Sequence, residues 1–325
     1  MNNAKGWLVL LLLQTVWLAS CSSEADKWQK QLNQQALTAQ TSITRLKQHI
    51  DSNQISNTRI LTQYASIVGE ANPEMRDLTR ALAQDAQTNG PLIRGLESRL
   101  ADAETDISRV VSIGLQPVKN VFAELTAINT AANPQTYGMM LTDPINVLAD
   151  MSKGKLARVA AMSRDASARI NKADDFGAGS QLVGNPQYGN WRSNSSGNSF
   201  WHWYGQYAFF STMFRSPIGY SSWGRHRDYG YYNDYGRSAY TSPSQRRGQN
   251  SVERRTKDRF ARSGKSFNSP YSKTKHTTSK VARSQARLSS QNRSSSGFSR
   301  PAPKSTTSSY RSSSYQSSRS SYGGK

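Results

Sequence analysis

The chain has few residues of several kinds, and each shortage excludes a class of structure or chemistry. It has one cysteine in 325 residues, so no disulfide can form within it and no metal site can be built from several thiolates. Large aliphatic residues nearly vanish after Ile218, where only Val252, Val281 and Leu288 remain. The longest apolar run, Trp7–Leu18, has 12 residues, and a helix that spans a bilayer needs about 20.

Acidic residues are scarce in the second part of the chain. Residues 1–200 hold 19 Lys/Arg and 17 Asp/Glu, whereas residues 201–325 hold 23 Lys/Arg and 4 Asp/Glu. The net charges are therefore +2 and +19, which together give the +21 of the whole chain. This asymmetry predicts a nearly neutral body followed by a basic tail. A dense positive charge binds polyanions because binding releases their counterions.

The start of the chain has the pattern of a bacterial export signal. Lys5 precedes the short apolar run, and small residues then lead to the single cysteine in Leu18-Ala19-Ser20-Cys21. This tetrapeptide resembles the lipobox of bacterial lipoproteins. The resemblance covers residues 1–21 and implies that residues 1–20 are a signal peptide removed just before Cys21.

The same resemblance implies a covalent lipid and a location. In that family the cysteine carries a thioether-linked diacylglycerol and an N-acyl chain, and two or three acyl chains make a stable anchor. An Asp after the lipidated cysteine retains many such proteins at the inner membrane. Here the residue is Ser22, so the resemblance implies the outer membrane of a bacterial cell envelope.

Residues 21–175 are predicted to be an all-α body, an elongated bundle or coiled-coil-like stack of helices. Helical spacing of apolar residues, with Pro, Gly or Asn at the breaks, predicts helices over 74–88, 91–113, 117–131, 145–151 and 155–170. Asp143 and Pro144 are expected to be the N-cap and the first residue of one helix. Short connections favour antiparallel neighbours.

Residues 24–72 are expected to form one long helix. Apolar or small residues repeat at steps of three and four, and Asn53 and Asn57 occupy the two positions between Ile50 and Ile60. The expected buried face is Leu32, Ala36, Ala39, Ile43, Leu46, Ile50, Asn53, Asn57, Ile60, Tyr64 and Ile67. The spacing fits both a heptad seam and an ordinary amphipathic helix. Both interpretations remain open from the sequence.

Residues 176–223 combine a Gly-rich hinge with an aromatic segment. Residues 177–186 are expected to be a hinge or a loop, and twelve aromatic residues follow between Tyr188 and Trp223. Two interpretations compete: an ordered appendage that packs its rings onto the body, and an interfacial segment that meets a membrane. We expect Trp201, Trp203 and Tyr204 to be partner-binding aromatics.

Residues 224–325 are predicted to be a disordered basic tail rich in Ser, Arg and Tyr. Too few large aliphatics remain to offset the entropy of ordering the chain. Interleaved Tyr and Arg side chains suit weak, salt-sensitive, multivalent contacts. Its densest basic cluster is predicted to bind a partner and consists of Arg246, Arg247, Arg254, Arg255 and Arg259.

The sequence points away from catalysis. The four histidines are scattered over the chain without the spacing of metal ligands on a helix. We therefore expect no enzyme activity, no catalytic residues, no metal and no cofactor other than the covalent lipid on Cys21.

These features predict a lipid-anchored envelope protein with a structural or tethering role. The expected partners are the membrane and an anionic envelope polymer or an acidic protein, with self-association through the helices as an option and no nucleic acid in the physiological setting. The alternative is a cell-wall enzyme, or an accessory factor of one, with its site in the helical body.

Overall fold

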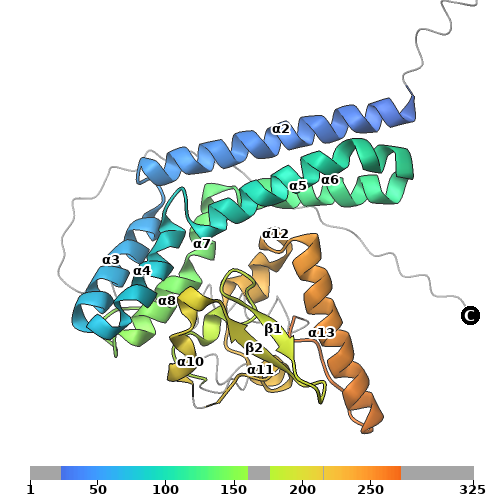
Figure 1. Ribbon diagram of the computed structural model, residues 1–325. Helices are drawn as coiled ribbons and strands as arrows, with labels where there is room; N and C mark the ends of the chain where they lie inside the picture. The colour runs from blue at the N-terminus through green and yellow to red at the C-terminus, as the bar shows by residue number, and fades with distance from the viewer. Residues whose placement is uncertain (1–22, 160–175, 215, 272–325) are drawn as a thin grey trace, which may run out of the picture.

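The computed structural model describes residues 23–159, 176–214 and 216–271, and over these the chain is mostly helical with one small β-hairpin (Figure 1). In chain order the elements are α2 (Glu24–Asp51), α3 (Ser56–Ala71), α4 (Arg76–Ala83), α5 (Pro91–Ile113), α6 (Leu115–Ala131), α7 (Pro134–Met140), α8 (Thr142–Met151), β1 (Gly189–Ser193), β2 (Ser199–Trp203), α10 (Phe210–Met213), α11 (Tyr220–His226), α12 (Arg237–Tyr240) and α13 (Pro243–Arg262). The expected signal peptide and Cys21 lie outside the described residues.

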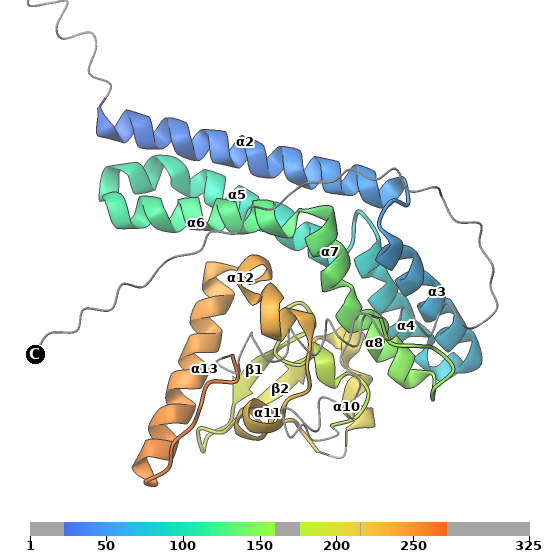
Figure 2. The same cartoon turned by 180° about the vertical axis from the view of Figure 1, so that it is seen from behind.

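Helices α2, α5 and α6 lie side by side as a three-helix bundle (Figures 1 and 2). Helix α2 begins with a capping box in which the Ser23 hydroxyl accepts from the Asp26 N–H and the Asp26 carboxylate accepts from the Ser23 N–H. The face that it buries is the predicted one: Leu32, Ala36, Ala39, Ile43, Leu46 and Ile50. Pro91 begins α5 and Gly114 follows its end, as predicted.

The predicted long helix is interrupted between Asp51 and Ser56. Asn53 takes a left-handed backbone conformation with φ of 56°, which asparagine tolerates better than most residues. The break shifts the helical phase, so α3 buries Leu61 and Val68, whereas Ile67 of the expected face is exposed. The prediction of one continuous helix, with both asparagines on its buried face, was wrong.

Helices α3, α4 and α8 form a second group beyond the break (Figure 2). Asp143 was expected to cap α8, but it lies within the helix and is buried. Its Oδ1 and Oδ2 accept from the backbone N–H groups of Tyr231 and Tyr232 at 2.6 and 2.9 Å. The Asp143 carboxyl therefore does not cap α8 but connects this helix to a segment almost 90 residues later in the chain. Of the helix expected over 155–170, residues 155–159 are not helical and the remainder is not described.

The expected hinge is a buried loop. Leu182 and Val183 are fully buried, and the 3-10 turn Ser180–Leu182 packs on α8. At Gly179, with φ of 95°, an added Cβ would lie 2.6 Å from the Phe210 ring. This position therefore needs glycine for close packing instead of for free movement. Of the two expectations for this segment, the structure favours the loop over the hinge.

The aromatic segment folds as an antiparallel β-hairpin followed by short helices. Its register pairs Trp191 with Trp201 and Gly189 with Trp203. Trp201 and Trp203 are two residues apart on β2, so they point to the same, buried side. The structure therefore favours the ordered appendage over an exposed interfacial segment.

Residues 224–271 are folded, which corrects the prediction that disorder begins at 224. Arg227 and Asp234 form a fully buried ion pair with N–O distances of 2.6 and 2.9 Å. Buried tyrosines here supply the apolar surface that aliphatic residues usually give. Residues 272–325 of the predicted tail lie outside the described residues.

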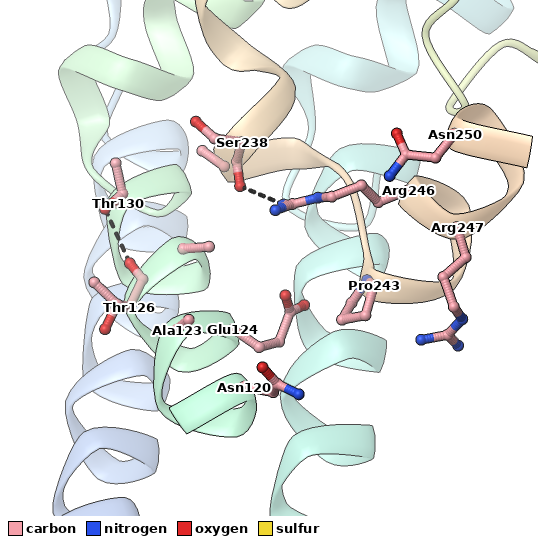
Figure 3. Close-up of a pocket in the computed structure, with 12 residues that line it drawn as sticks. Asn120, Ala123, Glu124, Thr126, Thr130, Ser238, Pro243, Arg246, Arg247 and Asn250 are labelled. Carbon is pink, nitrogen blue, oxygen red and sulfur yellow. Dashed lines mark hydrogen bonds between the residues drawn. The ribbon is translucent and has the colours of Figure 1, made fainter. Parts of the chain in front are cut away.

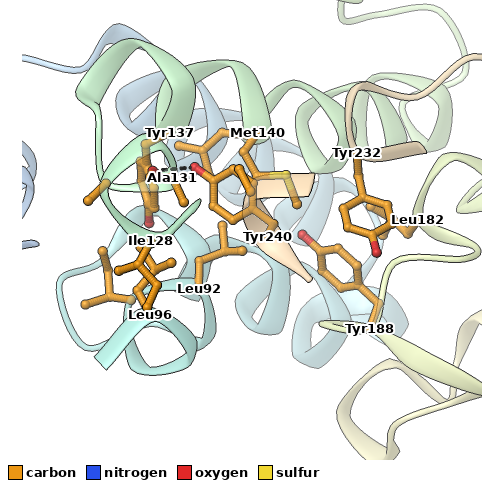
Figure 4. Close-up of a cluster of buried hydrophobic side chains, with 14 of the residues drawn as sticks. Leu92, Leu96, Ile128, Ala131, Tyr137, Met140, Leu182, Tyr188, Tyr232 and Tyr240 are labelled. Carbon is orange, nitrogen blue, oxygen red and sulfur yellow. Dashed lines mark hydrogen bonds between the residues drawn. The ribbon is translucent and has the colours of Figure 1, made fainter. Parts of the chain in front are cut away.

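One core joins the bundle to this late segment (Figure 4). Tyr240 of α12 is buried against α6, and its hydroxyl donates to the Ala131 carbonyl at 2.7 Å. The Tyr137 hydroxyl of α7 donates to the Asp85 carbonyl at 2.5 Å. Around these rings lie side chains from both parts of the chain: Leu92, Leu96, Ile128, Met140, Leu182, Tyr188 and Tyr232. The late tyrosines therefore complete a core that the early helices begin.

Candidate ligand-binding surface on helix α13

Helix α13 begins with strong local signals. The Ser242 hydroxyl accepts from the Gln245 N–H, the Gln245 side chain accepts from the Ser242 N–H, and Pro243 is the first helical residue. Val252 and Thr256 lie on its buried side. The opposite side is basic, with exposed Arg247, Arg254, Arg255, Lys257 and Arg262 against one exposed acid, Asp258.

All five predicted arginines lie on α13, but their surroundings differ. The Arg246 Nη2 donates to the Ser238 carbonyl at 3.0 Å. Arg255 donates to the Ser193 hydroxyl at 3.3 Å, and Arg259 donates to Asn198. These last two bonds attach α13 to the β-hairpin. Arg247, Arg254 and Arg255 are exposed, and Arg246 and Arg259 are partly buried.

A groove separates the hairpin from α13, and we call it the hairpin–α13 groove. It is a cavity of about 400 Å³ lined on the hairpin side by Trp191, Trp201 and Tyr204 and on the α13 side by Gln245 and Arg255 among others. The structure thus brings two predicted aromatics and one predicted arginine together. Aromatic faces beside amide and guanidinium donors suit a ligand with flat apolar faces and acceptor or anionic groups.

The three predicted aromatics are not equivalent. Tyr204 is exposed, which leaves its ring available for contact. Trp201 is buried and meets the groove with little of its surface, and Trp203 is buried against Phe210 and Phe214 outside the groove. Trp203 is as buried as Trp201 but does not line the groove, so its role in partner binding stays a prediction that this site does not support.

A second cavity lies on the other side of α13, against α6 (Figure 3). This α6–α13 cleft has a volume of about 530 Å³ and is lined by Glu124, Pro243, Arg246 and Arg247 among others. It continues past Pro243 into a space of about 550 Å³ that reaches Asp102, Asp106 and Arg109 of α5. Both signs of charge therefore face it, which makes it a poor site for a simple anion.

Arg99 and Glu124 form a buried ion pair that lines this cleft. The Arg99 Nε donates to the Glu124 carboxylate at 2.6 Å, and its Nη1 donates to the Ala239 carbonyl at 2.6 Å. Both side chains are about nine-tenths buried. The pair joins α5, α6 and α12, so we assign it a structural role.

The described residues provide no metal centre and no membrane span. No group of three or more His, Cys, Asp and Glu side chains among them is arranged to hold an ion. None of the helices in the described ranges is long and apolar enough to cross a bilayer.

Sequence reasoning missed Trp191, Asn190 and Gln249, which also line the hairpin–α13 groove. The signal for the hairpin was present. Bulky aromatics two residues apart in Trp201-His202-Trp203 follow the period of a strand, and Ser195-Ser196-Gly197 supplies a turn. The contribution of Gln249 could not be predicted, because it depends on where α13 packs.

No protein-family model, no curated protein and no solved structure matches this chain. The functional argument therefore depends on the residues themselves.

Proposed function

We propose that the protein is a lipid-anchored tether of the bacterial cell envelope, which holds an anionic polymer or an acidic partner near a membrane. The observation that carries this proposal is the sequence Leu18-Ala19-Ser20-Cys21, followed two residues later by the capped start of α2 at Ser23. The anchor would thus attach almost directly to the folded bundle.

The basic surface supports the second half of the proposal. Helix α13 exposes five basic side chains and one acidic one, and residues 272–325 add 11 Lys/Arg and no Asp or Glu. Such a charge excess attracts polyanions with a marked salt dependence. Beside it, the hairpin–α13 groove offers aromatic faces on which sugar rings of an envelope polymer can stack.

The anchor is tested by feeding cells that make the full chain an alkyne-bearing fatty acid and fractionating them. We expect the chain to be labelled and to sediment with the membranes. Cys21→Ala should lose the label and its membrane association, whereas the neighbouring Ser22→Ala should keep both. An unlabelled wild-type chain in the soluble fraction would overturn the proposal.

Polymer binding is tested by salt elution from immobilised dextran sulfate. The full chain should elute at the highest salt, and a chain ending at Tyr271 should elute earlier. Arg254→Gln with Arg262→Gln should shift elution of the shorter chain further, whereas Arg45→Gln with Arg76→Gln removes the same charge from exposed sites elsewhere and should shift it less. Equal shifts for both pairs would exclude a specific role for α13.

A further inference from the structure

One end of the three-helix bundle exposes an apolar turn. Within the described residues five large hydrophobic side chains are exposed, and two of them, Ile113 (59%) and Leu115 (47%), flank Gly114 where α5 turns into α6. The Gly114 backbone is open, with nothing within 4 Å of an added Cβ. We call Ile113, Gly114 and Leu115 the bundle tip.

The bundle tip lies at the end of the bundle where α2 begins. Figures 1 and 2 both show the α5–α6 turn beside the N-terminal end of α2. The Gln29 amide of α2 donates to the Ser108 hydroxyl of α5 at 3.3 Å, about one turn from each helix end. In the sequence only Ser22 separates Cys21 from Ser23, the N-cap of α2.

We infer that the bundle tip inserts its two aliphatic side chains into the bilayer that holds the anchor, as a second membrane contact that fixes the orientation of the bundle. This inference rests on the proposed lipidation of Cys21. A bilayer is the favoured occupant because the anchor would bring it to this end of the molecule. Transfer of exposed aliphatic side chains from water into the apolar part of a bilayer lowers the free energy.

The charges around the bundle tip indicate that this contact is apolar. Lys27, Lys30, Arg109 and Lys119 lie within about two turns of the helix ends at the tip, and Glu24, Asp26 and Asp106 lie among them. Nearly balanced charge gives little net attraction to anionic lipids. Insertion of the tip should therefore persist at high salt, whereas polymer binding by α13 and residues 272–325 should weaken.

The test uses the lipidated full chain in vesicles of phosphatidylethanolamine and phosphatidylglycerol. Because acylation consumes the one native thiol, Ile113→Cys or Leu115→Cys can each carry an environment-sensitive fluorophore without background. The matched control is Gln54→Cys, an exposed site at the other end of α2. Vesicles with spin-labelled lipid should quench the probes at 113 and 115 at least two-fold more than the probe at 54, in low and high salt alike.

Equal quenching at all three sites, in protein that floats with the vesicles, would overturn the inference and leave the proposed function intact. A spectral shift at 113 that depends on protein concentration and not on lipid would assign the tip to a second copy and would also overturn it. Mass spectrometry of Cys21 is read separately. An unmodified cysteine would overturn the proposed function and, because the anchor is what brings the bilayer to the tip, this inference with it.

Discussion

At the scale of single residues, the most unusual groups are buried carboxyls. Asp85 and Asp143 are buried, and burial raises the pKa of each to about 7, against the lowering effect of its hydrogen bonds. In the unfolded chain an Asp carboxyl has a pKa of about 3.9. The folded state therefore binds these protons more tightly, and stability falls as the pH rises from about 4 to 7.

The first prediction concerns Asp85→Asn. The amide oxygen can still accept from the Tyr188 hydroxyl, which donates to Oδ2 at 2.7 Å, but it cannot ionise. Between pH 4 and 7 the free energy of unfolding should fall less in the variant than in the wild-type protein. The two falls should differ on the order of 2–4 kcal/mol. Urea unfolding at pH 5 and pH 8 measures this. Asp77→Asn, at an exposed carboxyl, should leave the slope unchanged, and an unchanged slope for Asp85→Asn would contradict the prediction.

At the scale of elements, local signals decided what could be predicted. Helix α5 was predicted to the residue because Pro91 and Gly114 mark its two ends. The buried face of α2 followed from spacing alone. Helix α13 was missed although Ser242, Pro243 and Gln245 signal its start, because the scarcity of aliphatic residues favoured disorder. Its burial depends on contacts with distant segments, such as the bond from Gln249 to the Gly184 carbonyl. A count of aliphatic residues also underestimates a core built from tyrosines.

The candidate site was predictable in its residue types and not in its grouping. Aromatics and arginines were both singled out from composition. Their meeting in one groove depends on the hairpin register and on the side of α13 that is buried. Trp203 shows the limit, because it lies on the same buried side of β2 as Trp201 but packs against Phe210 and Phe214 instead of lining the groove.

The break between α2 and α3 gives the second prediction. Asn53 is exposed and left-handed, so a substitution there changes backbone energy and little else. Asn53→Val should cost about 1–2 kcal/mol of unfolding free energy, because a β-branched residue is strained in this conformation. Asn53→Gly should be nearly neutral. Chemical denaturation of both, with Gln54→Val as the neighbouring control, tests this, and equal losses at 53 and 54 would refute it.

At the scale of the whole molecule, the parts are not separable. The bundle, the second helical group and the hairpin region share buried hydrogen bonds, including those from Arg99 to Ala239 and from Tyr240 to Ala131. Each bond joins residues more than a hundred positions apart. We therefore expect one cooperative unit over the described residues.

Truncation gives the third prediction. A chain ending at Tyr271 should keep its melting temperature within about 2 °C, because every described contact is retained. A chain ending at Gly224 loses Tyr232, Tyr240 and Val252 from the core and should melt without a cooperative transition. Thermal denaturation followed by circular dichroism distinguishes the two. A sharp transition in the shorter chain would show that the early helices are self-sufficient.

The hydroxyl of Tyr240 that reaches back to Ala131 also has a consequence for the timing of folding. The first 131 residues cannot complete their interior until more than a hundred further residues have been synthesised, and contacts of such long range form slowly. A nascent chain whose core closes late remains incompletely folded for longer. If the chain is exported as we propose, slow closure would keep it unfolded long enough to pass a translocation channel.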